Sequence, residues 1–171
     1  FESHASNLVA SDINSSNDVF IHDRQTEKTI MASVDSSGSH GDWASFDPSI
    51  SADGRYVAFE SRADNLVADD TNRVLDVFVR NLQTNTTTRV SLASDGTQGN
   101  DFSYASSLSA DGRYVAFCSY ASNLVNDDTN GAPDVLLEKC TQIYAGDGVR
   151  PMTSDLDVAI FDEEWLGDFV G

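Results

Sequence analysis

The stretch Ser51-Ala-Asp-Gly-Arg-Tyr-Val-Ala-Phe59 decides the fold, because it occurs again unchanged as Ser109-Ala-Asp-Gly-Arg-Tyr-Val-Ala-Phe117. The two copies are offset by 58 residues, from position 51 to position 109. The same offset places Phe59-Glu-Ser-Arg-Ala-Asp-Asn-Leu-Val67 opposite Phe1-Glu-Ser-His-Ala-Ser-Asn-Leu-Val9 and Phe117-Cys-Ser-Tyr-Ala-Ser-Asn-Leu-Val125. Long matches at a fixed offset indicate a structural repeat.

Each repeat is expected to be all β. Three short segments rich in β-branched and aromatic residues are bounded by Asp, Asn, Gly and Ser, namely Tyr56–Glu60, Asp76–Arg80 and Thr86–Leu92. A weaker strand is predicted at Ser45–Ile50, and Asp53-Gly54 then forms a tight hairpin turn, because Gly tolerates the positive φ that such turns need. Four antiparallel strands per repeat are typical of the blade of a β-propeller.

The order of these motifs resembles the TolB-like, WD-repeat-like β-propeller family. The resemblance rests on the Ser-Ala-Asp-Gly-Arg-Tyr-Val-Ala-Phe motif, the Asn-Leu-Val motif and an Asp-x-Asn sequence before Asp-Val-Phe, and it covers residues 1–139. It implies blades in repeats 1–58 and 59–116 and a partial blade in 117–139. Closed propellers have roughly four to eight blades. We therefore expect an incomplete propeller, or one that other chain segments complete.

The tail from residue 140 to 171 departs from the repeat and is acidic. Alternation of apolar residues in Asp155–Phe161 predicts one strand there. Three interpretations stay open: a strand that closes the last blade, a strand donated to a neighbouring chain, and a shortened fourth blade. Donation from one chain to the next would build filaments.

Composition excludes two classes of partner. The 171 residues carry 28 acidic and 10 basic side chains, giving a formal charge of −18, and the only lysines are Lys28 and Lys139. Nucleic acid is not expected as a partner, because its binding depends on Lys and Arg at the phosphates. Membrane insertion is not expected either, since no run approaches the roughly 18 apolar residues of a helical span.

Acidic and amide side chains recur in the loop between the second and third strands of each repeat. These candidate metal ligands are Asp12, Asn14, Asp18, Asp70, Asn72, Asp76, Asn126, Asp128, Asn130 and Asp134. Oxygen ligands at alternate positions of a turning backbone suit Ca²⁺, and the third loop, with Gly131 at its turn, resembles the calcium loops of integrin-type propellers. The alternative is that these residues form Asx-turns with their own backbone.

No catalytic machinery is expected. A nucleophilic triad needs a histidine base, and His4, His22 and His40 all fall at variable repeat positions, where we expect exposed side chains. Trp43 and Tyr120 replace non-aromatic residues of another repeat, which makes them candidates for a ligand or glycan contact or, alternatively, for local packing.

The recurring phenylalanines are predicted to form the core between blades, and they are Phe20, Phe59, Phe78 and Phe117. Cys118 and Cys140 are placed at opposite ends of an antiparallel strand pair, roughly 16 Å apart. A disulfide requires Cα atoms within about 7 Å. We therefore expect two free thiols, or pairing that involves the tail.

These observations predict a non-catalytic extracellular β-propeller module with a structural or an interaction role, stabilised by Ca²⁺ if the acidic loops bind metal. Its partner would be a protein, a glycan or a second copy of the chain. The family resemblance implies a secreted, periplasmic or cell-surface location. Two alternatives remain: a surface filament subunit that uses strand donation, and the accessory propeller of a secreted hydrolase.

Overall fold

A computed structural model describes residues 1–10, 12–126 and 128–140. Within these ranges the chain forms ten strands and no helix. The strands are β1 (Glu2–Ser3), β2 (Asp18–Asp23), β3 (Lys28–Met31), β4 (Ser45–Ile50), β5 (Tyr56–Ser61), β6 (Asp76–Asn81), β7 (Thr86–Arg89), β8 (Ser103–Leu108), β9 (Tyr114–Ser119) and β10 (Asp134–Lys139). The expectation of an all-β chain is confirmed for this part of the protein.

The second repeat forms a complete antiparallel sheet in the order β4-β5-β6-β7. Ser51 N donates to Tyr56 O across the turn that joins β4 to β5, and Gly54 has a φ of 70°. The expected hairpin is therefore confirmed. Between Phe46 and Ser49 the register shifts, and Pro48, which has no N–H, lies in this bulge.

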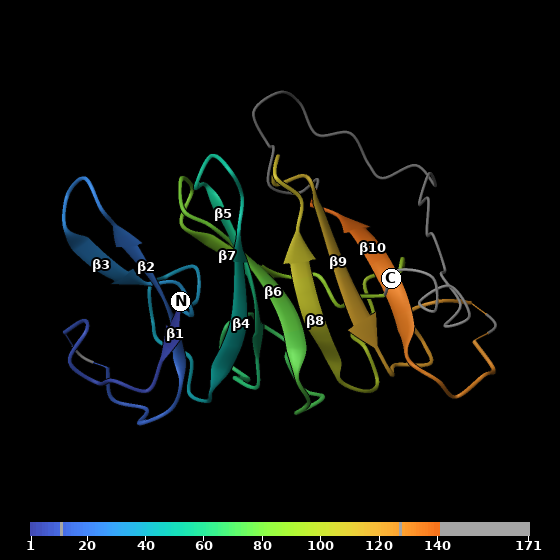
Figure 1. Cartoon of the computed structure of the whole chain (residues 1–171). Helices are drawn as coiled ribbons and strands as arrows, with labels where there is room; N and C mark the ends of the chain where they lie inside the picture. Colours follow the sequence, from blue (N-terminus) through green and yellow to red (C-terminus); the bar gives the residue numbers. More distant parts are fainter. Residues whose placement is uncertain (11, 127, 141–171) are drawn as a thin grey trace, which may run out of the picture.

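Three sheets lie side by side in chain order (Figure 1). The first contains β1-β2-β3 and the third contains β10-β9-β8, both antiparallel. The period of four strands holds in the second sheet, while the described residues supply three strands to each of the others. Together these residues form an open row of sheets and no closed ring.

The apolar core lies between neighbouring sheets. Side chains of a strand alternate between its two faces, so Val57 and Phe59 of β5 pack toward the first sheet and Tyr56 and Ala58 toward the third. All of β5 and β6 is consequently buried. All four phenylalanines predicted as core are buried, and each contributes about 1.5–3 kcal/mol. Phe59, Phe78 and Phe117 lie between sheets, as predicted, whereas Phe20 packs within its own repeat.

Strand β7 ends at Arg89 rather than at Leu92, so the predicted length of this strand was wrong. The physical reason is a side chain that replaces a backbone partner: the N–H of Val77 donates to Ser91 Oγ at 3.2 Å. Ser91 Oγ in turn donates to Asp76 Oδ1. The Ser91 hydroxyl therefore replaces a backbone hydrogen-bond partner at the point where the pairing of β6 with β7 ends.

Cys118 lies near the end of β9 and Cys140 directly after β10, and both are free. The predicted strand at Asp155–Phe161 and the rest of the tail lie outside the described residues. None of the described elements is a helix of the length and apolarity that membrane crossing requires.

Candidate functional site

In the second repeat, a buried arginine lies at the centre of the predicted metal loop. Arg89 Nη1 is 2.9 Å from Asp70 Oδ1 and 3.5 Å from Asp76 Oδ2, and none of the three side chains is more than 7% exposed. Arg89 ends β7 and is paired with Phe78, which carries its guanidinium to the loop that precedes β6. Two of the predicted calcium ligands therefore share a cation that the chain itself supplies.

Asn72 holds the same loop as an Asx-turn. Its Oδ1 accepts a hydrogen bond from the N–H of Val74 at 3.3 Å. Its Nδ2 donates to Asp76 Oδ2 at 2.9 Å and to the carbonyl of Gly99 at 3.0 Å. The amide nitrogen, not the oxygen, thus faces the Asp76 carboxylate.

Burial dominates the electrostatics of this loop. It raises the pKa of Asp70 to about 6, although the Arg89 guanidinium acts in the opposite direction, and the Asp76 carboxylate raises the value further. Burial also raises the pKa of Asp76, while hydrogen bonds from Ser91 and Asn72 and the charge of Arg89 lower it. In this loop, the attraction of one guanidinium therefore opposes the cost of removing two carboxylates from water.

The first loop has the same turn without the arginine. Asn14 Oδ1 accepts from Ser16 N at 2.9 Å, and Asn14 Nδ2 donates to the carbonyl of Gly41 at 2.8 Å. Asp18 is fully buried, and its Oδ1 accepts from Ser33 Oγ at 2.8 Å. Asp18 Oδ2 and Asp12 Oδ1 are shielded from solvent and have no hydrogen-bond partner among the described residues.

The third loop is more open. The N–H of Asn130 donates to Asp128 Oδ1 at 3.3 Å, and Asn130 Oδ1 accepts from Ala132 N at 2.7 Å. Asn130 Nδ2 lies 3.5 Å from Asp134 Oδ1, and Asn126 is exposed. The sharp turn expected at Gly131 is present, with a φ of 64°.

All three loops therefore contain Asx-turns. Within the described ranges, no three His, Cys, Asp or Glu side chains form a ready-made metal centre. Calcium binding by the ten predicted ligands stays a prediction.

His4 and His22 are exposed, as expected, and His22 Nδ1 lies 3.0 Å from Thr29 Oγ1. The expectation was wrong for His40, which is half-buried and whose Nδ1 is shielded without a hydrogen-bond partner in the described part of the chain. Its counterpart in the next repeat, Gln98, bonds to Thr71. Ile13 occupies the Thr71 position in the first repeat and offers no such partner.

Three aromatic rings form a cluster on the third sheet, made of Phe102, Tyr104 and Tyr120. Ring centroids are 4.6 Å apart for Phe102 and Tyr120, 5.7 Å for Phe102 and Tyr104, and 5.9 Å for Tyr104 and Tyr120. Phe102 and Tyr120 are each 41% exposed. The N–H of Tyr120 donates to the carbonyl of Phe102 at 3.0 Å, which fixes the two rings beside each other.

The repeat offset explains why this aromatic cluster occurs once in the described chain. Its counterparts in the second repeat are Ala44, Phe46 and Arg62. The sequence analysis pointed to Tyr120 but missed Phe102, although Phe102 also replaces a non-aromatic residue, Ala44; Tyr104 gave no signal because its counterpart, Phe46, is aromatic too. Trp43, the other predicted contact residue, is also exposed.

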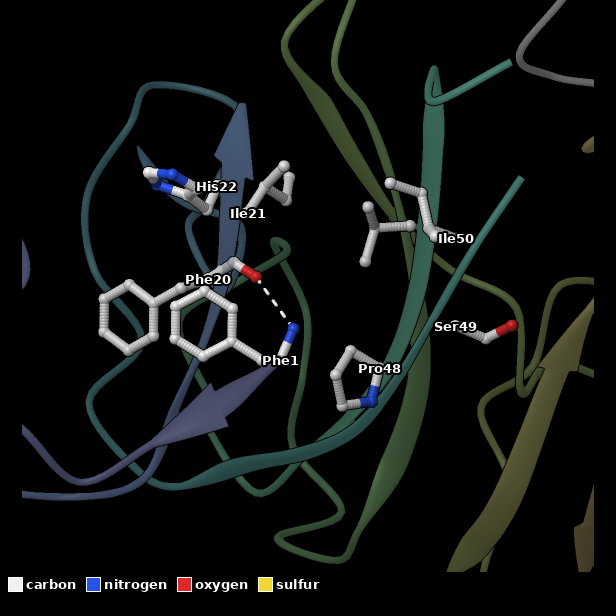
Figure 2. A pocket seen from close by; sticks show the side chains of 8 residues that line it. Phe1, Phe20, Ile21, His22, Pro48, Ser49 and Ile50 are labelled. Atoms are coloured by element: carbon white, nitrogen blue, oxygen red, sulfur yellow. Dashed lines mark hydrogen bonds between the residues drawn. The ribbon is translucent and has the colours of Figure 1, made fainter. Parts of the chain in front are cut away.

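A pocket of about 240 Å³ lies between the first and second sheets (Figure 2). It is mostly apolar and is lined by Phe1, Phe20, Ile21, His22, Pro48, Ser49, Ile50 and Val57. The amino group of Phe1 donates to the carbonyl of Phe20 at 3.1 Å, and the N–H of Phe20 donates to the carbonyl of Phe1 at 2.8 Å.

Comparison with known proteins finds similar solved structures. No protein-family model matches the sequence, and no curated protein matches it. The crystal structure of TolB from Acinetobacter baumannii is similar to this chain, with 18% sequence identity and a TM-score of 0.42. The match covers 82% of this chain and 27% of that chain, so the chain spans about a quarter of that protein's length.

Burial of acids in these sheets predicts a pH dependence of stability. Burial raises the pKa of Glu138 to about 7 and that of Asp70 to about 6, whereas unfolded Glu and Asp titrate near 4.3 and 3.9. The folded state therefore binds these protons more tightly, and the stability they contribute falls as pH rises through this window. We expect the thermal midpoint, followed by circular dichroism, to rise when the pH is lowered from 8 to 5.

Glu138→Gln is the control for this pH dependence. It removes the group that titrates highest, so the change between pH 6 and 8 should shrink while the change between pH 5 and 6 persists. Exposed acids such as Asp53 and Asp111 have lowered pKa values, so their titration changes the stability only below about pH 4. A midpoint that falls steadily from pH 8 to 5 would contradict the prediction.

Proposed function

We propose that this chain is part of a non-catalytic extracellular β-propeller module, in which each sheet is one blade, and that it binds a neutral glycan through the aromatic cluster. The repeat, the four-stranded second sheet and the core between neighbouring sheets support the propeller arrangement. The exposed aromatic cluster is the observation that carries the binding role.

The size and charge of the surface favour a glycan over the other partner considered, a protein. A stable protein interface buries roughly 800 Å² on each side, and three rings, each less than half exposed, offer much less. Tyrosine combines an apolar ring face with a hydroxyl that can bond to a sugar. The net charge of −18 disfavours anionic glycans, so a neutral one fits best.

Calorimetric titration with cellohexaose, chitohexaose and laminarihexaose tests this proposal. We expect one of them to bind, and Tyr120→Ala to weaken that binding at least ten-fold, about 1.4 kcal/mol. Ile30→Ala is the matched control, because Ile30 is a similarly exposed apolar side chain on the first sheet. If no neutral oligosaccharide binds, or if the two variants lose affinity equally, the glycan proposal fails.

A further inference from the structure

The acidic loops of the first two repeats share one scaffold. The N–H of Val19 donates to Ser33 Oγ at 3.1 Å, as Val77 N–H donates to Ser91 Oγ at 3.2 Å. The serine hydroxyl then donates to Oδ1 of the aspartate that starts the strand, Asp18 or Asp76. The match extends to the asparagine in each loop, which donates to a glycine carbonyl 27 residues later.

One difference between the repeats removes the buried cation from the first loop. In the second sheet Phe78 is paired with Arg89, and in the first sheet Phe20 is paired with Met31 at the same register. Met31 packs with Phe20 and Val34 in a small apolar cluster and carries no charge. The first loop thus keeps both carboxylates but lacks the cation that the second loop places between them.

The oxygens left without partners are the counterparts of those that contact the guanidinium. In the second loop Arg89 Nη1 contacts Oδ1 of Asp70 and Oδ2 of Asp76. In the first loop Asp12 Oδ1 and Asp18 Oδ2 are shielded and have no hydrogen-bond partner among the described residues. Because the scaffold is the same, both oxygens border the position that a cation takes in the second loop.

Neighbouring charges agree with this placement. Burial raises the pKa of Asp18 most, the hydrogen bond from Ser33 and the nearby Asn14 amide lower it, the Asp12 carboxylate raises it, and His40 lowers it. His40 also has a shielded Nδ1 without a partner in the described chain. Two carboxylates and one imidazole are therefore within electrostatic reach of one another, with no Lys or Arg among them.

We propose that the first repeat binds a divalent metal ion between Asp12 Oδ1 and Asp18 Oδ2, at the position that corresponds to the Arg89 guanidinium. A hard cation that keeps several of its waters is held by as few as one or two protein carboxylates, as Mg²⁺ commonly is, which accounts for a site with fewer than three protein ligands in place. An oxygen-only site suits such a cation, with Mg²⁺ or Ca²⁺ as the occupant. This inference is independent of glycan binding.

The decisive test is Met31→Arg, which introduces the arginine of the second repeat at the corresponding position of the first, where its guanidinium would occupy the proposed metal position. The probes are CaCl₂ and MgCl₂, each titrated into chelator-treated protein while the thermal midpoint and the heat of binding are measured. For the unmodified chain we expect a higher midpoint and one bound ion. For Met31→Arg we expect a higher midpoint in chelator and at least a ten-fold loss of metal affinity.

Further variants test the proposal if Met31→Arg fails to fold. Asp12→Asn, at a half-buried position, should also lose at least ten-fold in affinity, whereas the exposed-loop variant Asp95→Asn should lose nothing. His40→Ala should bind the ion with unchanged affinity, because His40 does not complete a three-ligand group with the two carboxylates. The proposal is overturned if neither ion raises the midpoint, which would assign the carboxylates to a shared proton, or if Asp12→Asn and Asp95→Asn bind alike.

Discussion

Arg89→Met is expected to lower the free energy of unfolding by about 3–5 kcal/mol, the cost of leaving buried charges without their partner. The guanidinium lies between the carboxylates of Asp70 and Asp76, and all three side chains are removed from water. Without it, two like charges remain in a poorly solvated site. Urea unfolding at pH 7.5, followed by circular dichroism, measures the loss.

The pKa of Asp70 provides an internal check on this mechanism. Because this pKa is about 6, Asp70 is largely protonated at pH 5 and no longer repels Asp76. The cost of Arg89→Met should therefore be smaller at pH 5 than at pH 7.5. Arg62→Met, at an exposed position, is the control and should change stability by no more than about 0.5 kcal/mol. A loss that is independent of pH would show that the arginine acts through packing alone.

Arg89→Met also tests whether the second acidic loop can bind an ion in the same way as the first. It leaves Asp70 and Asp76 without the buried cation, as Asp12 and Asp18 are in the first repeat, where Met31 stands at the corresponding position. If the first loop binds a divalent ion, this variant should acquire a second bound ion and recover part of its stability when the ion is added. Calorimetric stoichiometry of the variant against the unmodified chain measures this gain.

Most of the sheet structure could be predicted because its signals are local. The hairpin at Asp53-Gly54, the strand from Asp76 and the buried Phe59 are each marked by residues within a few positions of one another. Repetition at one offset strengthened these signals, since every element was seen more than once. The end of β7 was missed because Ser91 interacts with Val77, fourteen residues away.

The candidate sites were harder to predict because they join residues that are distant in the sequence. Asp70 and Asp76 were recognised as acidic, but Arg89 meets them only through the pairing of β6 with β7. A pattern of Asp and Asn therefore suggested a metal where the chain supplies its own cation. The informative signal was a difference between the repeats, which have Met31 and Arg89 at equivalent positions, rather than a motif that they share.

Gly112→Ala is expected to be the second most destabilising change, with a loss of about 2–5 kcal/mol. Gly112 has a φ of 69°, which costs an L-residue about 1–2 kcal/mol. A Cβ there would also lie 2.3 Å from Cδ2 of Tyr56, a side chain buried between the second and third sheets. Overpacking of this kind adds about 1–3 kcal/mol. Urea unfolding measures the sum.

Gly54→Ala is the matched control, because Gly54 occupies the same position one repeat earlier. Its φ of 70° imposes the same strain, but no heavy atom lies within 4 Å of its Cβ position, so only about 1–2 kcal/mol should be lost. The difference between the variants therefore isolates the contact between sheets. The β4-β5 and β8-β9 hairpins cannot move apart freely to relieve the contact with Tyr56, because the N–H of Ala52 donates to the carbonyl of Ala110 at 2.8 Å. Equal losses in the two variants would mean that the third sheet does not pack on Tyr56 as described.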